Sequence, residues 1–336
     1  MNTKISSTKK HPVKNHLLDL MDLPVQYIEN IFEASDLMLS LIRKNKIVKK
    51  EHGTLSIALA FFEPSTRTKI SFQQAATLLG HDCIVFDIEG SSISKGESFL
   101  STLHTLNSMM FDILVLRHPH SGAAHFATQV LNCPVINAGD GSHAHPLQAL
   151  TDIFTIRHAL GQILGLTVVI IGDILHSRVA RSNIWGLTKL GATIILCGPP
   201  SLLPNQNDLS LFFNKNTHPR SSIQTETSLN KAVEKADVIM PLRIQKERTN
   251  NHEQQALSNY RKNYRITKET LSFAPKNARI MHPGPINEGV EILGEIAYSD
   301  QSLIFDQVRN GVAIKMAVLE VFRSLLNERG KIHRQA

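Results

Sequence analysis

The stretch between residues 55 and 79, LSIALAFFEPSTRTKISFQQAATLL, contains an apolar run, a short polar segment and a helical pattern in immediate succession. The apolar run, residues 55–62, is typical of a buried strand, and residues 69–79 are typical of a helix. Short apolar runs alternate with helical patterns along the rest of the chain as well. Strands that alternate with helices indicate parallel sheets in an α/β fold.

The predicted strands form two series along the chain. The first comprises residues 55–62, 83–86, 113–116 and 135–137, and the second comprises residues 167–171, 193–196, 238–240 and 279–281. Because a chain of 336 residues is too long for one ordinary core, each series predicts a domain of its own. We therefore expect an α/β protein with two doubly wound parallel-sheet domains linked by helices.

Helical patterns and polar stretches suggest the domain limits. Helices are expected at residues 25–42, 146–160 and 305–326, and loops at residues 205–222 and 247–263. The expected division is a flexible tail (1–16), a first domain (17–148), a second domain (149–304) and a C-terminal helix (305–336) that returns to pack on the first domain.

Composition argues against several classes of protein. Hydrophobic residues make up 42% and charged residues 19% of the chain, which is ordinary for a soluble globular protein. No apolar run approaches the roughly 18 residues of a membrane span, and no apolar segment follows the N-terminal lysines as it would in a secretory signal. The three widely spaced cysteines predict neither a disulfide framework nor a zinc-thiolate site. A cytoplasmic protein is expected.

The chain carries an excess of positive charge, with 36 Lys and Arg against 29 Asp and Glu. Nucleic-acid binding is one interpretation, but the basic residues form no long run and aromatic residues are only 6% of the chain. The excess also suits an enzyme with small anionic substrates, because a positive cleft concentrates anions. We favour anionic substrates, and expect no nucleic acid and no membrane as partners.

The polar segment after the first strand predicts an anion site. Ser65, Thr66, Arg67 and Thr68 stand where the next helix begins, so free backbone N–H groups and the helix dipole favour negative charge there. The guanidinium of Arg67 adds a planar fork for phosphate oxygens. The plainer alternative is an ordinary N-cap by Ser65 or Thr66. The segment is not a P-loop, since no GxxxxGK[ST] occurs.

Ser65-Thr66-Arg67-Thr68 resembles the carbamoyl phosphate signature of the aspartate/ornithine carbamoyltransferase family. Later segments agree with the family in order: Arg117-His118-Pro119, His145-Pro146-Leu147-Gln148, the residues 176–182 and 243–248, and His282-Pro283-Gly284-Pro285. The resemblance covers roughly residues 15–325. It implies transfer of a carbamoyl group from carbamoyl phosphate to an amino acid, without metal or organic cofactor.

The acceptor implied by the resemblance is L-aspartate, so the products would be N-carbamoyl-L-aspartate and phosphate, an early step of pyrimidine biosynthesis. Aspartate carries two carboxylates and needs several fixed cations. The ornithine enzymes typically carry a Cys in a His-Cys-Leu-Pro motif, whereas this chain has His282-Pro283-Gly284-Pro285. The Arg-x-Gln at Arg243 and Gln245 is similar to the aspartate enzymes.

The resemblance also assigns site residues. It implies that carbamoyl phosphate is held by Ser65, Thr66, Arg67, Thr68, Arg117, His145, Gln148, Gly284 and Pro285. It implies that aspartate is held by Lys95, Arg178, Arg243 and Gln245. Thr68, Arg117 and His145 are expected to act in catalysis, around the carbonyl oxygen that gains charge. Glu63 is expected either to orient Arg67 or Arg117 or to be a plain surface carboxylate.

The resemblance further implies a homotrimer with sites shared between subunits. Lys95, with Ser91 or Ser92 beside it, lies in a segment similar to the family's mobile loop that reaches the neighbouring subunit. In some bacterial relatives the chain also assembles with dihydroorotase or with a separate regulatory chain. The motif 176–182 and the extended N-terminus resemble the dihydroorotase-associated type.

Three alternative interpretations of the chain remain open, and two residues depart from the family pattern. The alternatives are an inactive paralogue, an ornithine enzyme and a dinucleotide oxidoreductase, the last disfavoured because Gly172 is not followed by the glycines that a pyrophosphate requires. His143 and His145 could suggest a metal pair, but no third ligand is apparent at a suitable spacing. Glu288 and Ser101 depart from the family pattern, where Arg and Asp are usual.

Overall fold

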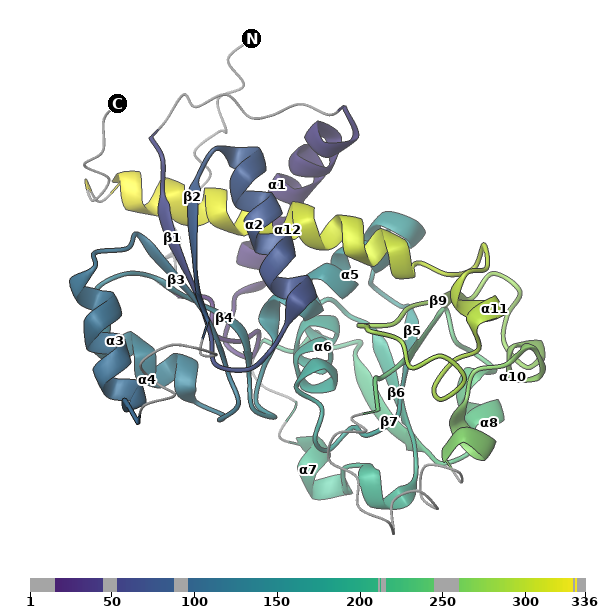
Figure 1. Cartoon of the computed structure of the whole chain (residues 1–336). Helices are drawn as coiled ribbons and strands as arrows, with labels where there is room; N and C mark the ends of the chain where they lie inside the picture. The colour runs from purple at the N-terminus through teal and green to yellow at the C-terminus, as the bar shows by residue number, and fades with distance from the viewer. Residues whose placement is uncertain are drawn as a thin grey trace.

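Two parallel β-sheets form the framework of this computed structural model, which describes residues 16–44, 53–87, 96–210, 212, 216–244, 260–328 and 330 (Figure 1). The first sheet has the order β2-β1-β3-β4, with strands Asp82–Asp87, Ser56–Phe61, Ile113–His118 and Val135–Asp140. The second has the order β7-β6-β5-β8-β9, with strands Ser222–Glu226, Thr193–Cys197, Thr167–Ile171, Val238–Pro241 and Arg279–Ile280. The predicted α/β fold with two parallel sheets is confirmed.

Side chains of β1 alternate between two layers of helices. Ile57, Leu59 and Phe61 belong to one core with residues of α2 (Thr66–Leu79) and α12 (Ile304–Glu328). Ala58 and Ala60 pack on the opposite face with residues of α3 (Phe99–Ser108) and α4 (Ala123–Val130). Because the strand is buried on both faces, its sequence is a continuous apolar run.

The second sheet is built in the same way. Val168 and Ile170 of β5 share a core with α5 (Pro146–Leu160) and α6 (Arg178–Lys189). Val169 and Ile171 face a separate core with α8 (Leu229–Val233). Short helices complete this part of the chain: η2 (Pro200–Leu202), α7 (Gln206–Ser210), α8 (Leu229–Val233), α10 (Lys268–Ser272) and α11 (Gly294–Ala297).

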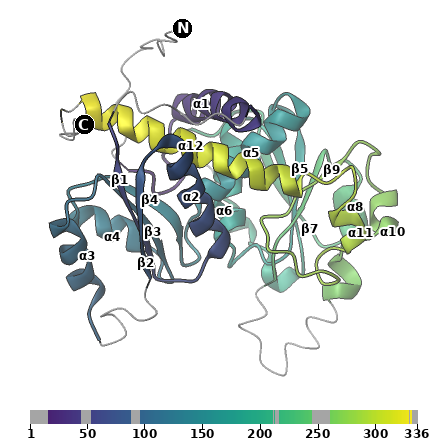
Figure 2. The ribbon, with the colours of Figure 1, turned by 45° about the horizontal axis from the view of Figure 1, so that its top comes forward.

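The C-terminal helix α12 runs back across the molecule. It packs against α1 (Val25–Arg43), α2 and α5, and Figure 2 shows it extending from the helices of the first sheet toward the second sheet. The predicted return of this helix to the first domain is therefore confirmed. None of the described helices is both long enough and apolar enough to cross a membrane.

The two expected loops differ from the structure. The predicted loop at residues 205–222 contains α7 and reaches the first residue of β7, and residues 260–264 are helical. The strand β7 has the sequence SIQTE and lies at the edge of the sheet, so it pairs only with β6 and needs few apolar side chains. Of the predicted tail, only His16 is described, and its Nδ1 accepts a hydrogen bond from Val135 N (3.1 Å).

Candidate active site

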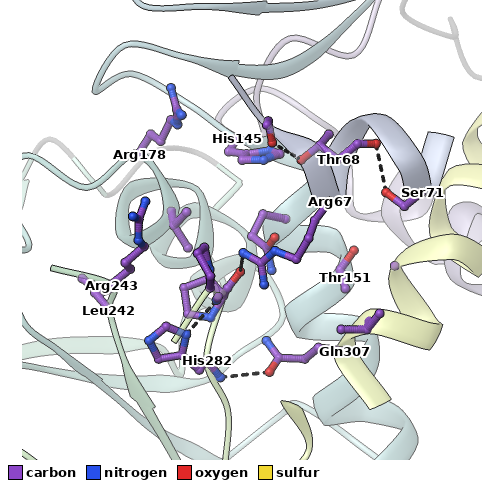
Figure 3. A pocket seen from close by; sticks show the side chains of 18 of the residues that line it. Arg67, Thr68, Ser71, His145, Thr151, Arg178, Leu242, Arg243, His282 and Gln307 are labelled. Carbon is purple, nitrogen blue, oxygen red and sulfur yellow. Dashed lines mark hydrogen bonds between the residues drawn. The ribbon is translucent and has the colours of Figure 1, made fainter. Parts of the chain in front are cut away.

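A cavity of about 570 Å³ opens at the carboxyl ends of the strands of both sheets (Figure 3). Its lining comes from the segments that follow β1, β4, β5, β8 and β9, from Arg117 near the end of β3, and from α12. In each sheet one strand lies where the order reverses: β1 between β2 and β3, and β5 between β6 and β8. Ligands of open α/β sheets bind at such switch points. Here the two switch points face the same cavity.

The first helical turn of α2 forms one wall of this cavity. Ser65 is the N-cap residue, but its side chain makes no capping hydrogen bond; its Oγ donates to Thr68 Oγ1 (2.9 Å). Ser71 Oγ donates to the carbonyl oxygen of Thr68 (3.0 Å). The interpretation of Ser65 as an ordinary side-chain cap is therefore wrong. With no acidic residue in this first turn, its N–H groups and hydroxyls suit an anion.

Arg67 joins α2 to the segment that follows β9. Its Nη2 donates to the carbonyl oxygen of Pro283 (3.1 Å), and Figure 3 shows Arg67 reaching toward this segment. Gly284 has φ +56°, and a Cβ on it would lie 1.7 Å from Arg67 Nη1. Only glycine allows this approach. Gly284 N also donates to His282 Nδ1 (2.7 Å), so Nε2 carries the ring proton and donates to Glu291 Oε1 (3.1 Å).

Glu63 connects cations that come from the two sheets. Its Oε1 accepts from Arg117 Nη2 (2.8 Å) and from Arg178 Nη2 (2.8 Å), and its Oε2 accepts from Arg178 Nη1 (3.0 Å). Burial alone would raise the pKa of Glu63, but the hydrogen bonds and charges of both arginines lower it. Of the two expected partners, Glu63 binds Arg117, and its bonds to Arg178 were not expected. Gly139 lies so close that a Cβ would come within 3.2 Å of both guanidinium groups.

His145 lies buried among positive charges at the N-terminus of α5. Its backbone N donates to Ser182 Oγ (2.8 Å), and its Nδ1 is buried without a hydrogen-bond partner among the described residues. Burial and then the charges of Arg117 and Arg178 lower the pKa of His145 well below its ordinary value. The ring is therefore neutral at physiological pH and can donate one N–H without carrying charge.

Gln148 is oriented by a buried carboxylate one turn further along α5. Gln148 Nε2 donates to Asp152 Oδ1 (2.7 Å), so its own Oε1 remains as an acceptor beside the cavity that it lines. Asp152 also accepts from Gln307 Nε2 (2.8 Å) and from Asn183 Nδ2 (2.8 Å). Gln307 Oε1 in turn accepts from His282 N (2.9 Å), which links this cluster to the segment that carries Gly284.

Most of the residues assigned from the sequence line this one cavity. They are Ser65, Thr66, Arg67, Thr68, Arg117, His145, Gln148, Arg178, Arg243, Gly284 and Pro285. Lys95, Gln245, Ser91 and Ser92 lie outside the described residues. The two departures, Glu288 and Ser101, do not line the cavity.

Several lining residues were not found from the sequence. Thr151, Gln307, Gly311 and Lys315 come from α5 and α12, and Asp173 and His176 follow β5. Gly311 and Lys315 are four residues apart in α12, so they share one face of this helix. This spacing was the sequence signal that could have placed both residues at one site. Among the residues that the structure describes, no group of three or more His, Cys, Asp or Glu is arranged to hold a metal ion.

Two family models together match nearly the whole chain. The model described as "Aspartate/ornithine carbamoyltransferase, carbamoyl-P binding domain" matches residues 15–158. The model described as "Aspartate/ornithine carbamoyltransferase, Asp/Orn binding domain" matches residues 164–322. The boundary between the two matches falls at the end of α5.

Individual relatives agree with the family models. The aspartate carbamoyltransferase catalytic subunit of Roseiflexus sp. (strain RS-1) is 46% identical over 320 residues, covering 95% of this chain and 98% of the relative. The aspartate transcarbamoylase of Trypanosoma cruzi, in complex with N-(phosphonacetyl)-L-aspartic acid, has a TM-score of 0.82 and 29% identity over 91% of this chain and 94% of its own. The ornithine carbamoyltransferase of Pyrococcus furiosus also has a TM-score of 0.82, with 27% identity over 91% of this chain and 96% of its own. This chain belongs to the aspartate/ornithine carbamoyltransferase family.

Proposed function

We propose that this protein transfers the carbamoyl group of carbamoyl phosphate to the amino group of L-aspartate, giving N-carbamoyl-L-aspartate and phosphate, as an early step of pyrimidine biosynthesis. The observation that carries the proposal is the cavity itself, in which an anion site at the start of α2 faces a second group of cations, Arg178 and Arg243. One molecule with a phosphate and one with two carboxylates match these two halves.

The phosphate group is assigned to the first turn of α2. Ser65, Thr66, Arg67 and Thr68 offer hydroxyl, guanidinium and backbone donors within one turn. The charge and dipole of this turn favour both the bound carbamoyl phosphate and the released phosphate. The departing phosphate is also a proton acceptor for the attacking amine, since the phosphate gains negative charge as its bond to carbon breaks.

The carbonyl oxygen of the carbamoyl group is assigned to Arg117, His145 and Thr68. Amine attack produces a tetrahedral centre whose oxygen carries negative charge, and fixed donors around it lower the barrier. Arg117 is 9% exposed and held by Glu63 and by the carbonyl oxygen of Ala138 (3.2 Å), so it is already oriented before substrate arrives. His145 acts as a neutral donor, because its burial, and then the charges of the surrounding cations, lower its pKa.

The carbamoyl NH2 is assigned to acceptors on the other side. Gln148 presents Oε1, since its NH2 is bound to Asp152, and the carbonyl oxygens near Gly284 and Pro285 supply further acceptors. A donor group matched by fixed acceptors distinguishes a carbamoyl group from an acetyl group of the same shape.

Aspartate is favoured over ornithine as the acceptor. Arg178 and Arg243 line the cavity and suit carboxylates, and in the sequence Lys95 and Gln245 add to them. The δ-amine of ornithine would need a free acid. Of the two described carboxylates that line the cavity, Glu63 is bonded to Arg117 and Arg178, and Asp173 is paired with His176 Nδ1 (2.9 Å). The equal TM-scores of the aspartate and ornithine enzymes mean that the fold alone does not favour either acceptor.

We also propose a cytoplasmic homotrimer in which Lys95, with Ser91 or Ser92, completes the site of a neighbouring subunit. Exposed apolar side chains of the α3 and α4 region support an interface there: Leu100, Met109, Met110 and Phe126. Light scattering on the purified chain would give the oligomeric state. Co-purification with dihydroorotase or with a regulatory chain would decide between the two partners suggested by the sequence.

Phosphate release from carbamoyl phosphate, with L-aspartate and L-ornithine as parallel acceptors, tests the activity. We expect release that depends on aspartate, together with formation of carbamoyl aspartate. Release with ornithine alone would keep the phosphate assignment and overturn the roles of Arg178 and Arg243.

Arg117→Ala tests the assignment of the carbonyl oxygen. Loss of one such donor should lower kcat by about 10²–10³. The matched control is Arg309→Ala, which removes an exposed arginine of α12 that pairs only locally with Asp306 (3.0 Å) and should leave kcat unchanged. Near-normal turnover in a folded Arg117→Ala protein would refute the assignment.

A further inference from the structure

Lys315 is a buried cation that faces the cavity from α12. The residue is 7% exposed, and it lines the cavity together with Gly311 and Thr151. Because Lys315 lies in α12, this helix contributes directly to the site. The sequence motifs assign no role to Lys315.

The surroundings of Lys315 contain no compensating negative charge. Its Nζ donates to the carbonyl oxygen of Gly311 (2.9 Å) and lies 5.6 Å from the centre of the Phe72 ring. Among the described residues, no carboxylate lies within the 4.0 Å that defines an ion pair with it. A buried charge without a counter-ion is costly, so a ligand that supplies the opposite charge would be bound favourably there.

The charged and titratable neighbours of Lys315 do not neutralise its charge. Arg67 from α2 and His145 from the start of α5 are the groups whose fields couple to Lys315, and Asp152 of α5 is already bonded to three amides. Burial first, and then the charge of Arg67, lower the pKa of Lys315 to about 8. Lys315 and Arg67 therefore repel each other until an anion lies between them.

We propose that Lys315 is an additional ligand of the phosphate group, whose negative charge completes the ion pair that the protein leaves open. This assignment rests on the proposed function, since it uses the same bound phosphate. An ammonium has three donors, and one is used by Gly311, so two remain for phosphate oxygens.

Phosphate binding should change the protonation of Lys315. Because the pKa of Lys315 is lowered to about 8, part of the free protein holds this lysine as the neutral amine near pH 8.5, whereas a bound phosphate dianion favours the charged ammonium. Phosphate binding should therefore take up a substantial fraction of one proton. Arg67 stays charged and His145 stays neutral at this pH, so neither contributes.

Isothermal titration calorimetry with inorganic phosphate at pH 8.5, in two buffers of different ionisation enthalpy, measures affinity and proton uptake together. Lys315→Met should weaken phosphate binding by about 10- to 100-fold, the range for a lost charge-assisted hydrogen bond, and abolish the uptake. Lys315→Arg keeps the charge permanently, so it should abolish the uptake while retaining most of the affinity. Lys235→Met, at an exposed lysine outside the cavity, is the matched control and should change neither quantity.

Wild-type affinity and uptake in Lys315→Met would overturn the proposal. If that variant does not fold, persistent uptake in Lys315→Arg would overturn it equally. The carbamoylation assay separates this proposal from the proposed function. Phosphate binding with proton uptake, but without carbamoyl aspartate, would refute the function and leave the lysine assignment intact.

Discussion

Asp152 sets the direction in which a neighbouring amide points. Its two oxygens accept hydrogen bonds from Gln148, Gln307 and Asn183, and burial raises its pKa to about 6. Gln307 is held at a second point by His282 N, and Asn183 by the carbonyl oxygen of Val179 (3.0 Å). Gln148 is the amide whose other end faces the cavity, so it is the one most free to turn.

Asp152→Asn should reduce the preference for carbamoyl phosphate over acetyl phosphate. In one orientation the new amide directs its NH2 at the donors of Gln148 and Gln307, and in the other at the donor of Asn183. In the first orientation a turned Gln148 would present NH2 to the carbamoyl NH2. An unsatisfied buried donor costs about 1–3 kcal/mol, or roughly 10- to 100-fold in kcat/KM. The measurement is kcat/KM for carbamoyl phosphate beside the inhibition constant of acetyl phosphate, which lacks the NH2.

The double variant Gln148→Glu with Asp152→Asn separates orientation from simple loss of packing. It keeps the total charge and restores an acceptor on both sides of position 148, so the preference should return. A folded double variant that remains as indiscriminate as Asp152→Asn would show that Asp152 acts through packing alone.

Among the elements, the turn between β4 and α5 depends on Asp140. This buried carboxylate accepts from Asn137 Nδ2 (2.7 Å), Gly122 N (2.7 Å) and Ala144 N (3.2 Å), and it pairs with His143 Nδ1 (3.1 Å). The hydrogen bond from His143 raises the pKa of that histidine against the effect of its burial. The turn leads directly into His145, so its stability affects the site.

The stability of wild type should therefore depend on pH through His143. A raised folded pKa means that the pair stabilises the fold fully below the unfolded pKa of about 6.5, and that this contribution is lost as pH rises through the folded pKa. In His143→Gln this loss should disappear. Urea unfolding between pH 5.5 and pH 9 measures the free energy of unfolding at each pH. Plotted against pH, this free energy should fall less steeply in His143→Gln than in wild type.

An unchanged profile in His143→Gln would show that other groups control this pH range. Lys315 and Arg117, with pKa values lowered to about 8 and about 10, titrate at the alkaline end in both proteins. The comparison of variant with wild type removes their contribution.

The elements also explain what the sequence could predict. Both sheets followed from continuous apolar runs, because strands buried on two faces leave no polar positions, as in β1. The edge strand β7 was missed because SIQTE has a partner on one side only. The bonds of Glu63 to Arg178 were missed because the two residues are 115 apart in sequence, and only the packing of the two sheets brings them together.

Across the whole molecule, one core connects the two sheets. A single cluster of buried residues includes Leu59 of β1, Ile170 of β5, Phe154 of α5 and Phe322 of α12. Glu63 adds a polar connection across the cavity. Because this core is shared, local stability in one sheet should depend on the other, and α12 is the element through which the effect is most easily tested.

Phe322→Ala should destabilise both halves of the molecule together. Phe322 is fully buried, and removal of such a ring typically costs about 3–5 kcal/mol. The chain has one tryptophan, Trp185 of α6, so its fluorescence reports on the second half, while circular dichroism reports on all helices. We expect both signals to shift to lower urea by the same amount, because α12 and α6 contribute to one core. Leu37→Ala, at an exposed leucine of α1, should shift neither. If the Trp185 transition stayed at its wild-type midpoint while the dichroism signal moved, the two halves would unfold independently, and the shared core would not couple them.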